Sequence, residues 1–291
     1  MPRGWIASLS GVTVVAPQDV ASVLEALAAR PGAQLLAGGT DFMVEVNFGH
    51  RRPAAVVSLH AVEELRGWSR AGDTLTIGAG VTYGELLAPP LSDLVPALAQ
   101  AARTVGSPQI RNAGTLGGNI ATASPAGDTL PVLAALDAVV VVAGPDGRRD
   151  VPLADVVVGP KQTSLGVDEL IVAVRVPLLD GPQEFLKVGT RNAMVIAVAS
   201  VALLVDRPGR SVRVALGSVG PVPLRARAAE AWVAGRLPWA PGRLLDPLVA
   251  DEFGRRVAEV TRPIDDHRST ADYRRHAIRV CTGRALRRAF A

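Results

Sequence analysis

The chain has 291 residues and a formal net charge of +4, and its length is sufficient for two domains that each bury a core. A composition of 48% hydrophobic and 20% charged residues is typical of globular proteins and excludes an intrinsically disordered chain. The single cysteine, Cys281, excludes an internal disulfide and an iron–sulfur cluster or CxxC zinc site held by this chain alone. The four histidines are scattered, so we predict no metal-binding residues.

Charge and hydropathy also limit the partners of the chain. The arginines of residues 274–288 share one predicted helix with apolar residues, a pattern typical of a solvated or partner-facing helix, and no nucleic-acid-binding motif accompanies them. The N-terminus lacks the basic-then-apolar pattern of a signal peptide, and the longest mostly apolar run, residues 194–205, is too short to span a bilayer. We therefore expect a cytoplasmic protein with no membrane span and no nucleic-acid partner.

Residues 12–59 have the pattern of a strand–helix–strand unit. Residues 12–17 and 34–37 are short apolar runs, and apolar residues recur at helical spacing between them, after the candidate helix N-cap Asp19. Residues 54–59 predict a further strand. Gly38 and Gly39 follow the second strand, at the carboxyl end where α/β units place ligands. They form a candidate phosphate loop, with a plain strand-to-helix turn as the alternative.

A second glycine-rich stretch covers residues 105–128 and includes Gly114, Gly117 and Gly118. Glycine lets the backbone approach a ligand closely and adopt positive φ, so several amide N–H groups can face one anion such as a diphosphate. Small hydroxyl and amide side chains beside the glycines add neutral donors. We predict that this stretch holds the phosphates of a nucleotide cofactor; the alternative is an elaborate turn without a ligand.

A third set of glycines, Gly78, Gly80 and Gly84, lies between a predicted strand and a predicted helix. The spacing is GxGxxxG, which differs from the GxGxxG dinucleotide fingerprint, and no strand ending in an acidic residue follows about 20 residues later. We interpret these glycines as a structural corner.

The rest of the chain predicts an alternation of strands and helices. The expected helices are 98–105 and 129–136; the expected strands are 138–143, 148–152, 167–177 and 211–219; residues 184–206 hold two strands or helices, and helices follow residue 225, separated by residues 237–242 and 263–267. Residues 180–183 are the best candidate for a domain boundary.

Several motifs together resemble one known family. The segments AGGTD (37–41), IGAGVTYGEL (77–86), RNAGTLGGNIATASPAGD (111–128) and LGSVGPVPLRARAAE (216–230) are similar in order and spacing to the FAD-binding (medium) subunit of molybdenum hydroxylases. That group contains aerobic carbon monoxide dehydrogenase and xanthine dehydrogenase. Residues 263–280 resemble the family's C-terminal helix, so the resemblance covers essentially the whole chain.

The resemblance implies an α+β fold with two domains. Residues 1–178 would form a PCMH-type FAD-binding domain, similar to that of vanillyl-alcohol oxidase. Its subdomains would be a small parallel βαβ unit (about 1–59) and a mostly antiparallel sheet (60–178), with FAD between them and with Gly78–Gly84 in the framework of the second. Residues 184–291 would form a C-terminal α+β domain with a three-stranded sheet and helices.

The resemblance also implies which residues hold the cofactor. The first loop, residues 35–42, would wrap the FAD diphosphate, and the second, residues 115–119, would clasp it from the other side. Asp128 matches an acidic position at the nucleotide end, while Lys187, with Arg191 as a further candidate, matches a segment that reaches the isoalloxazine. A cation there would stabilise charge that develops on reduction. The alternatives are a surface salt bridge for Lys187 and a helix cap for Asp128. The expected cofactor-binding residues are Leu35, Leu36, Ala37, Gly38, Gly39, Thr40, Asp41, Phe42, Val105, Thr115, Leu116, Gly117, Gly118, Asn119, Asp128, Ile171 and Lys187.

The function implied is that of an oxidoreductase subunit without catalytic residues of its own. Electrons would pass from partner [2Fe–2S] clusters through FAD to an external acceptor. The expected partners are a large molybdopterin-binding subunit and a small [2Fe–2S] subunit, in a dimer of heterotrimers. The single cysteine excludes the benzoyl-CoA reductase type, whose flavin subunit carries an extra cluster. The alternatives are a self-contained FAD-dependent oxidase of the same fold and a non-enzymatic nucleotide-binding protein.

Overall fold

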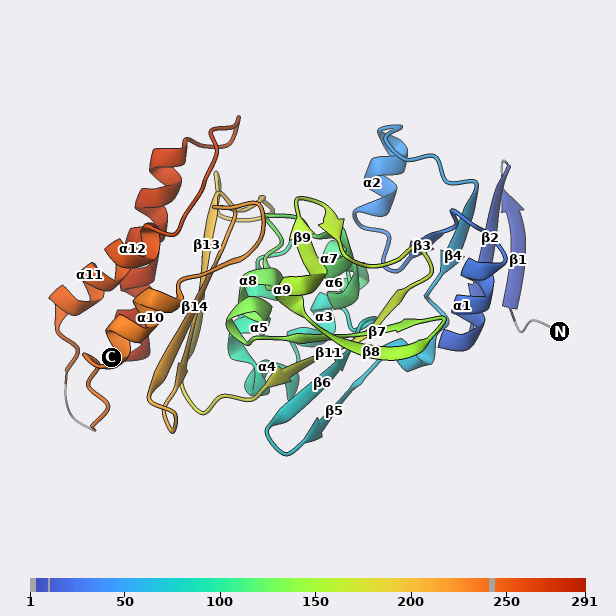
Figure 1. The fold of residues 1–291 in the computed structure, drawn as a ribbon. Helices are drawn as coiled ribbons and strands as arrows, with labels where there is room; N and C mark the ends of the chain where they lie inside the picture. The colour runs from blue at the N-terminus through green and yellow to red at the C-terminus, as the bar shows by residue number, and fades with distance from the viewer. Residues whose placement is uncertain (1–3, 10, 241–243) are drawn as a thin grey trace.

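The computed structural model describes residues 4–9, 11–240 and 244–291. The elements form three groups in a row, with the N-terminal strands at one end and the C-terminal helices at the other (Figure 1). Each group is built on its own β-sheet. No helix in the described part of the chain is long and apolar enough to cross a membrane.

The N-terminal group is a small sheet with two helices. Its elements are β1 (Gly4–Leu9), β2 (Val12–Pro17), α1 (Val20–Ala28), β3 (Gln34–Leu36), α2 (Phe42–Asn47) and β4 (Ala55–Ser58). Strands β2, β4 and β3 are parallel neighbours, and β1 pairs antiparallel with β2 at the edge. As predicted, Asp19 caps α1, because its Oδ1 accepts the Ser22 amide N–H at 2.7 Å.

The central group is a five-stranded antiparallel sheet covered by short helices. The strands have the order β5-β6-β11-β7-β8. The elements are η1 (Glu63–Leu65), β5 (Trp68–Ala71), β6 (Thr74–Gly78), α3 (Tyr83–Leu86), α4 (Leu91–Leu94), α5 (Pro96–Arg103), α6 (Pro108–Ala113), α7 (Leu116–Thr122), α8 (Thr129–Ala135), β7 (Val139–Gly144), β8 (Gly147–Pro152), α9 (Leu153–Val156), β9 (Val157–Gly159), β10 (Gln162–Thr163) and β11 (Leu170–Pro177).

The C-terminal group is an antiparallel sheet with three helices, of which α11 and α12 are the longest described in the chain. Its elements are β12 (Gln183–Val188), β13 (Ala199–Asp206), β14 (Ser211–Gly217), β15 (Leu224–Arg225), α10 (Arg227–Ala234), α11 (Pro247–Ala258) and α12 (Ala271–Ala289). The sheet has the three long strands that the resemblance implied, and the two-residue β15 is a fourth. Residues 237–242 were predicted to separate two helices; the structure describes this segment only as far as residue 240, and the rest of it lies outside the described residues.

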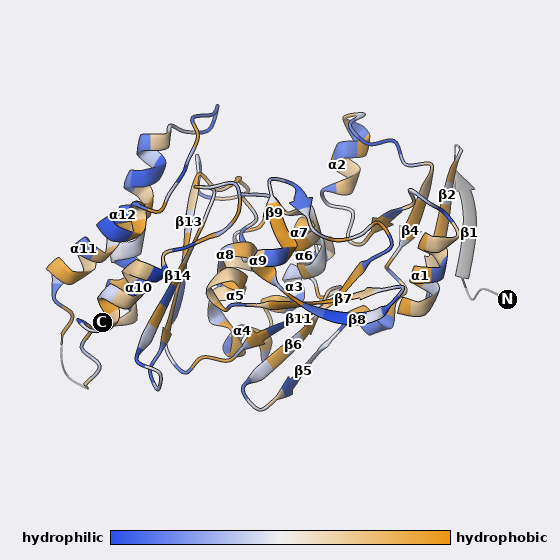
Figure 2. Cartoon of the chain, in the orientation of Figure 1, coloured by the Kyte–Doolittle hydropathy of each residue, from blue (hydrophilic) through white to orange (hydrophobic). Residues whose placement is uncertain are grey.

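The sheet of the C-terminal group also packs against the central group. Along β13, Ala202 and Leu204 belong to the core of the central group, whereas Val201, Leu203 and Val205 face the core under α11 and α12. Helices α5 and α8 cover one face and α12 covers the other. Burial on both faces explains why β13 is apolar without a break from residue 201 to residue 205 (Figure 2). Since apolar periodicity is then absent, the sequence could not separate strand from helix there.

Candidate functional site

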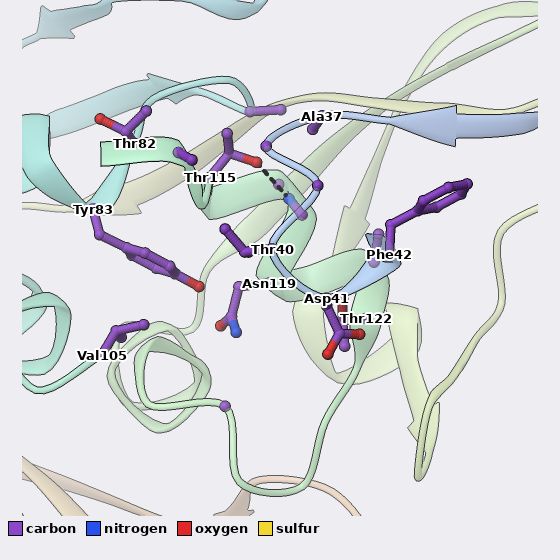
Figure 3. A pocket seen from close by; sticks show the side chains of 18 of the residues that line it. Ala37, Thr40, Asp41, Phe42, Thr82, Tyr83, Val105, Thr115, Asn119 and Thr122 are labelled. Carbon is purple, nitrogen blue, oxygen red and sulfur yellow. Dashed lines mark hydrogen bonds between the residues drawn. The ribbon is translucent and has the colours of Figure 1, made fainter. Parts of the chain in front are cut away.

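A pocket of about 860 Å³ lies where the N-terminal and central groups meet. It is lined by the loop between β3 and α2, the corner between β6 and α3, the segment from α6 to α8, and residues on and after β12. Figure 3 shows side chains from the first three of these segments converging on one space. The volume is typical of sites for cofactors and small molecules.

The β3–α2 loop, residues 37–42, lies directly against the end of α6. A Cβ added to Gly38 would be 1.7 Å from the carbonyl oxygen of Ala113, so only glycine permits this approach. Gly39 has φ of +72°, which also favours glycine. The double glycine therefore brings the two predicted loops together at one side of the pocket.

The main-chain amides of this first loop are available to a ligand. Among the described residues, no acceptor is bonded to the N–H groups of Gly38, Gly39, Thr40 or Asp41. Successive free amides at a turn attract anions because each presents a partial positive charge. These residues line the pocket, so its wall can bind a phosphate without a cation.

The second loop is different, because its glycines lie in the first turn of α7. Thr115 caps this helix, and Gly117 and Gly118 do not have positive φ. The amides of residues 116–119 all donate within the protein, to Val81 O (2.9 Å), Ala79 O (2.8 Å), Thr115 Oγ1 (3.0 Å) and Thr115 O (3.0 Å) respectively. The expectation that these amides face an anion is therefore wrong. Gly117 instead permits close packing, since a Cβ there would be 2.6 Å from Ala79 Cβ.

What the second loop offers to a ligand is its side chains. Asn119 Oδ1 accepts a hydrogen bond from Thr129 Oγ1 at 2.5 Å, which orients the amide. The side-chain nitrogen of Asn119, Nδ2, has no acceptor among the described residues, and Asn119 lines the pocket. The Thr115 hydroxyl accepts from Gly118 and keeps its own proton to donate. The loop thus contributes neutral side-chain donors to the pocket.

Asp128 and Lys187 form a buried ion pair at another part of the pocket. Lys187 Nζ lies 2.6 Å from Asp128 Oδ2, and the two side chains are 8% and 6% exposed. Lys187 also donates to Thr104 O at 3.1 Å, whereas Asp128 Oδ1 is buried without a partner. Burial raises the pKa of Asp128 above its usual value, and the charge of Lys187 opposes that increase.

This pair corrects the separate roles expected for its two members. Asp128 was expected at the nucleotide end of the cofactor and Lys187 at the isoalloxazine, whereas the structure brings the two side chains into direct contact. The two alternatives, a surface salt bridge for Lys187 and a helix cap for Asp128, are also wrong as stated. The salt bridge of Lys187 is buried, and Asp128 stands at the N-cap of α8 without a capping hydrogen bond from its side chain.

Most of the other expected residues also line the pocket. Leu36 and Leu116 do not, and the Leu116 side chain is fully buried in the core of the central group. Arg191 is not among the lining residues either; it donates to the carbonyl oxygens of Ala193 and Met194. The expected residues that line the pocket are Leu35, Ala37, Gly38, Gly39, Thr40, Asp41, Phe42, Val105, Thr115, Gly117, Gly118, Asn119, Asp128, Ile171 and Lys187.

Sequence reasoning missed part of the lining. The corner predicted as purely structural does pack closely, since a Cβ at Gly78 would be 2.3 Å from Leu65 O. The same corner nevertheless places Thr82 and Tyr83 in the pocket wall. The signal was the Thr82–Tyr83 pair between Gly80 and Gly84. Met194, Val195 and Ile196 also line the pocket, and only their apolar character marked them in the sequence.

An ion pair links α2 to the turn between β9 and β10 beside the pocket. Glu45 accepts from Lys161 and from Arg51, the latter at 3.0 Å, and all three residues line the pocket. Lys161 lies 116 residues from Glu45 in the sequence, so nothing local could have predicted the pair. These hydrogen bonds lower the pKa of Glu45 and keep it charged near neutral pH.

Comparisons with known proteins agree with this geometry. Residues 10–179 match the model of the FAD binding domain in molybdopterin dehydrogenase, and residues 184–289 match that of the CO dehydrogenase flavoprotein C-terminal domain. The glyceraldehyde dehydrogenase medium chain of Sulfolobus acidocaldarius is 31% identical over 277 residues, covering 94% of this chain and 96% of that protein. The xanthine dehydrogenase FAD-binding subunit of Escherichia coli O157:H7 is 31% identical over 282 residues, covering 94% of both.

A solved structure extends the similarity to three dimensions. Carbon monoxide dehydrogenase from Hydrogenophaga pseudoflava, in a form that lacks the Mo-pyranopterin moiety of the molybdenum cofactor, has a chain that is 31% identical. The TM-score is 0.85, with 95% of this chain and 96% of that chain covered. The implied α+β fold is therefore confirmed.

Proposed function

The chain belongs to the family of FAD-binding subunits of molybdopterin dehydrogenases, and from that premise we propose that it is the electron-transfer subunit of a heterotrimeric molybdenum hydroxylase. When bound, FAD supplies a redox centre that can take electrons from [2Fe–2S] clusters and pass them to an external acceptor. The observation that carries the proposal is the pocket with four free amides on one wall and a buried ion pair on another.

The residues present fit a flavin dinucleotide. The first loop suits a diphosphate, because its free amides can stabilise two negative charges by hydrogen bonds without desolvating a cation. The side chains of Thr115 and Asn119 add donors from the opposite helix. Asp128 Oδ1 is an acceptor that lacks a donor, and a buried acceptor without a partner is costly. Each of these features points to a ligand that carries both phosphates and a polar ring edge.

We place the isoalloxazine, with its N–H and carbonyl edge, at Asp128 and Lys187. The Asp128 oxygen can accept from the ring N–H, and Lys187 has a third proton beyond its bonds to Thr104 and Asp128. Met194 and Ile196, which line the same pocket, are 56% and 51% exposed. A ring that exchanges electrons with other molecules needs such an opening, whereas an adenine does not. The positive charge of Lys187 would stabilise the negative charge that develops on the flavin when it is reduced.

The partner chains are part of the proposal. Within the described residues no group of three or more His, Cys, Asp or Glu side chains could hold a metal ion. We propose that the molybdopterin and the [2Fe–2S] clusters belong to a large and a small subunit, in a dimer of heterotrimers, in the cytoplasm. Within the chain we propose a PCMH-type FAD-binding domain over 1–178, with subdomains at about 1–59 and 60–178, and a C-terminal domain over 184–291.

The test is affinity purification of the tagged full-length chain from its native host. We expect a yellow protein that releases FAD on heating, together with a molybdenum-containing large chain and a small cysteine-rich chain. Active flavoprotein recovered alone would instead favour the self-contained oxidase. A colourless protein that takes up no FAD on reconstitution would refute the proposal.

A further inference from the structure

Tyr83 is a pocket residue whose hydroxyl has no role in the fold. It begins α3, its side chain is almost fully buried, and it lines the pocket. The hydroxyl points toward Thr40 and Asn119, one residue from each loop (Figure 3). Among the described residues no group is hydrogen-bonded to this hydroxyl. The hydroxyl oxygen is not enclosed by protein atoms, so it is open to the pocket and can bond to an atom of a ligand there.

The ring of Tyr83 is held firmly in that direction. A Cβ added to Gly114 would be 2.8 Å from Tyr83 Cε2, so the ring packs against the bare backbone of the second loop. The Tyr83 amide donates to Gly114 O at 3.0 Å. Thr82 and Glu85 form a capping box that fixes the start of α3. The hydroxyl is thus preorganised, and ligand binding would cost little side-chain entropy.

The electrostatic surroundings keep the hydroxyl protonated. Burial raises the pKa of Tyr83, and the negative charges of Asp128 and Asp41 raise it further. Near neutral pH the group is therefore a neutral donor.

A neutral donor is useful here because the cations of the pocket wall already have acceptors. The basic side chains that line the described pocket are bonded to groups of the protein: Arg51 and Lys161 to Glu45, Lys187 to Asp128, and Arg66 to His60 O. Neutral groups can then share in holding a phosphate, and the first loop supplies its main-chain amides.

We propose that the Tyr83 hydroxyl donates a hydrogen bond to a phosphoryl oxygen of the bound dinucleotide, as a third arm of the cradle formed by the two loops. The inference rests on the proposed FAD site and extends it to a residue of the β6–α3 corner. The hydroxyl points toward Thr40, whose amide is free, and toward Asn119, whose side-chain nitrogen is free. The atom that it meets is therefore a phosphate oxygen rather than the flavin ring at Asp128 and Lys187.

The test compares wild type, Tyr83→Phe and Tyr273→Phe in the full-length chain after removal of flavin. Tyr83→Phe keeps the ring that packs on Gly114 and removes only the hydroxyl, and Tyr273 is an exposed control on α12. FAD and ADP are titrated separately, since ADP carries the diphosphate without the flavin. We expect Tyr83→Phe to raise the Kd of both ligands by roughly tenfold or more. The absorption maxima and midpoint potential of bound flavin should not change, and Tyr273→Phe should bind as wild type does.

Other outcomes separate this inference from the function on which it rests. Equal FAD affinity of wild type and Tyr83→Phe would overturn the role of Tyr83 while leaving the FAD site intact. A changed midpoint potential with unchanged ADP affinity would place the hydroxyl at the flavin ring and would also overturn it. Failure of the wild type itself to bind FAD would refute both proposals.

Discussion

Lys187 and Asp128 lie 59 residues apart in the sequence, yet Nζ of the first is 2.6 Å from Oδ2 of the second. Lys187 belongs to β12 of the C-terminal group, and Asp128 precedes α8 of the central group. The ion pair therefore joins two parts of the molecule at the wall of the pocket. Because the remaining oxygen of Asp128 has no partner, the pair also presents an unsatisfied acceptor to a ligand.

Replacing Lys187 by methionine should destabilise the protein in a pH-dependent way. The substitution leaves the buried carboxylate of Asp128 without its cation, at a cost of about 3–5 kcal/mol in the free energy of unfolding at pH 7. Burial already raises the pKa of Asp128, and loss of Lys187 raises it further. Folded protein then keeps the proton where unfolded protein has lost it, so stability increases as the pH falls through the raised pKa.

Urea unfolding of Lys187→Met and wild type between pH 4.5 and 8 measures this effect. The difference in the free energy of unfolding between wild type and Lys187→Met should be largest at high pH and should decrease toward pH 4.5. Adding Asp128→Asn to Lys187→Met should recover part of the loss at pH 7, because no buried charge remains. A deficit that is independent of pH would contradict this explanation.

The glycines of the two loops should differ in their tolerance of a methyl group. Gly38→Ala places Cβ 1.7 Å from a main-chain oxygen, so the first loop must move and FAD affinity should fall by more than about a hundredfold. A Cβ at Gly118 meets only Thr115 Oγ1, at 2.9 Å, and otherwise opens toward the pocket. Gly118→Ala should therefore still fold, with a loss of up to about 1 kcal/mol if the Thr115 cap is displaced, and the larger Gly118→Val should lose bound FAD.

The flavin content of the purified variants, together with their thermal unfolding, measures how differently Gly38 and Gly118 tolerate substitution. Gly235→Ala is a suitable control, because Gly235 has negative φ and no atom lies within 4 Å of its added Cβ. Unchanged flavin content in Gly118→Val would argue against placing a ligand beside α7.

Removing Lys161 should affect the rate at which FAD leaves more than the stability of the fold. The Lys161–Glu45 pair joins α2 to the β9–β10 turn beside the pocket, but the Lys161 side chain is 58% exposed. An ion pair this accessible to solvent contributes at most about 1 kcal/mol. We expect Lys161→Ala to release FAD roughly two- to fivefold faster at low salt, and the difference should vanish near 1 M salt, where charges are screened.

Stopped-flow release of FAD into excess apoflavoprotein acceptor measures this rate. Arg52→Ala removes a nearby positive charge for which no ion pair is seen in the described structure, and it serves as the matched control. Equal release rates for Lys161→Ala and wild type at low salt would show that the pair does not close the pocket.

Arg274 should be essential to the C-terminal group because its guanidinium joins several main-chain segments. Its side chain is 5% exposed, and Nη1 donates to Val198 O at 2.7 Å and Ser218 O at 3.0 Å, while Nη2 contacts Asp266. The Ser218 amide in turn donates to Pro125 O, in the turn just before Asp128. Arg274→Met should cost about 3–5 kcal/mol and weaken FAD binding through that turn.

Chemical unfolding and FAD titration of Arg274→Met test this linkage. Arg275→Met is the matched control on the same helix, since Arg275 is half exposed and, within the described residues, forms an ion pair with Asp272 alone. The stability of Arg275→Met should stay within about 0.5 kcal/mol of wild type. Normal FAD affinity in a folded Arg274→Met protein would show that the turn does not depend on Arg274.

Local signals predicted the elements of this fold well. Asp19 begins α1 as its N-cap type indicated, and the short apolar runs at residues 12–17 and 211–219 became β2 and β14. The sequence alone left β12 and β13 open between strand and helix, because the apolar run of β13 has no periodicity. That choice depends on helices covering both faces of the strand, which no local pattern contains.

The sequence by itself predicted that Gly38, Gly39, Gly117 and Gly118 belong to one site, and the tertiary structure decided that all four line one pocket and what each contributes. Amides of the first loop are free, whereas those of residues 116–119 are used by Val81, Ala79 and the Thr115 cap. The tertiary structure likewise decided that Asp128 forms an ion pair with Lys187 and that Tyr83 lines the pocket. The physical reason is that the partners of these hydrogen bonds and ion pairs come from distant segments of the chain. Glycine spacing indicates only where the backbone must closely approach another group.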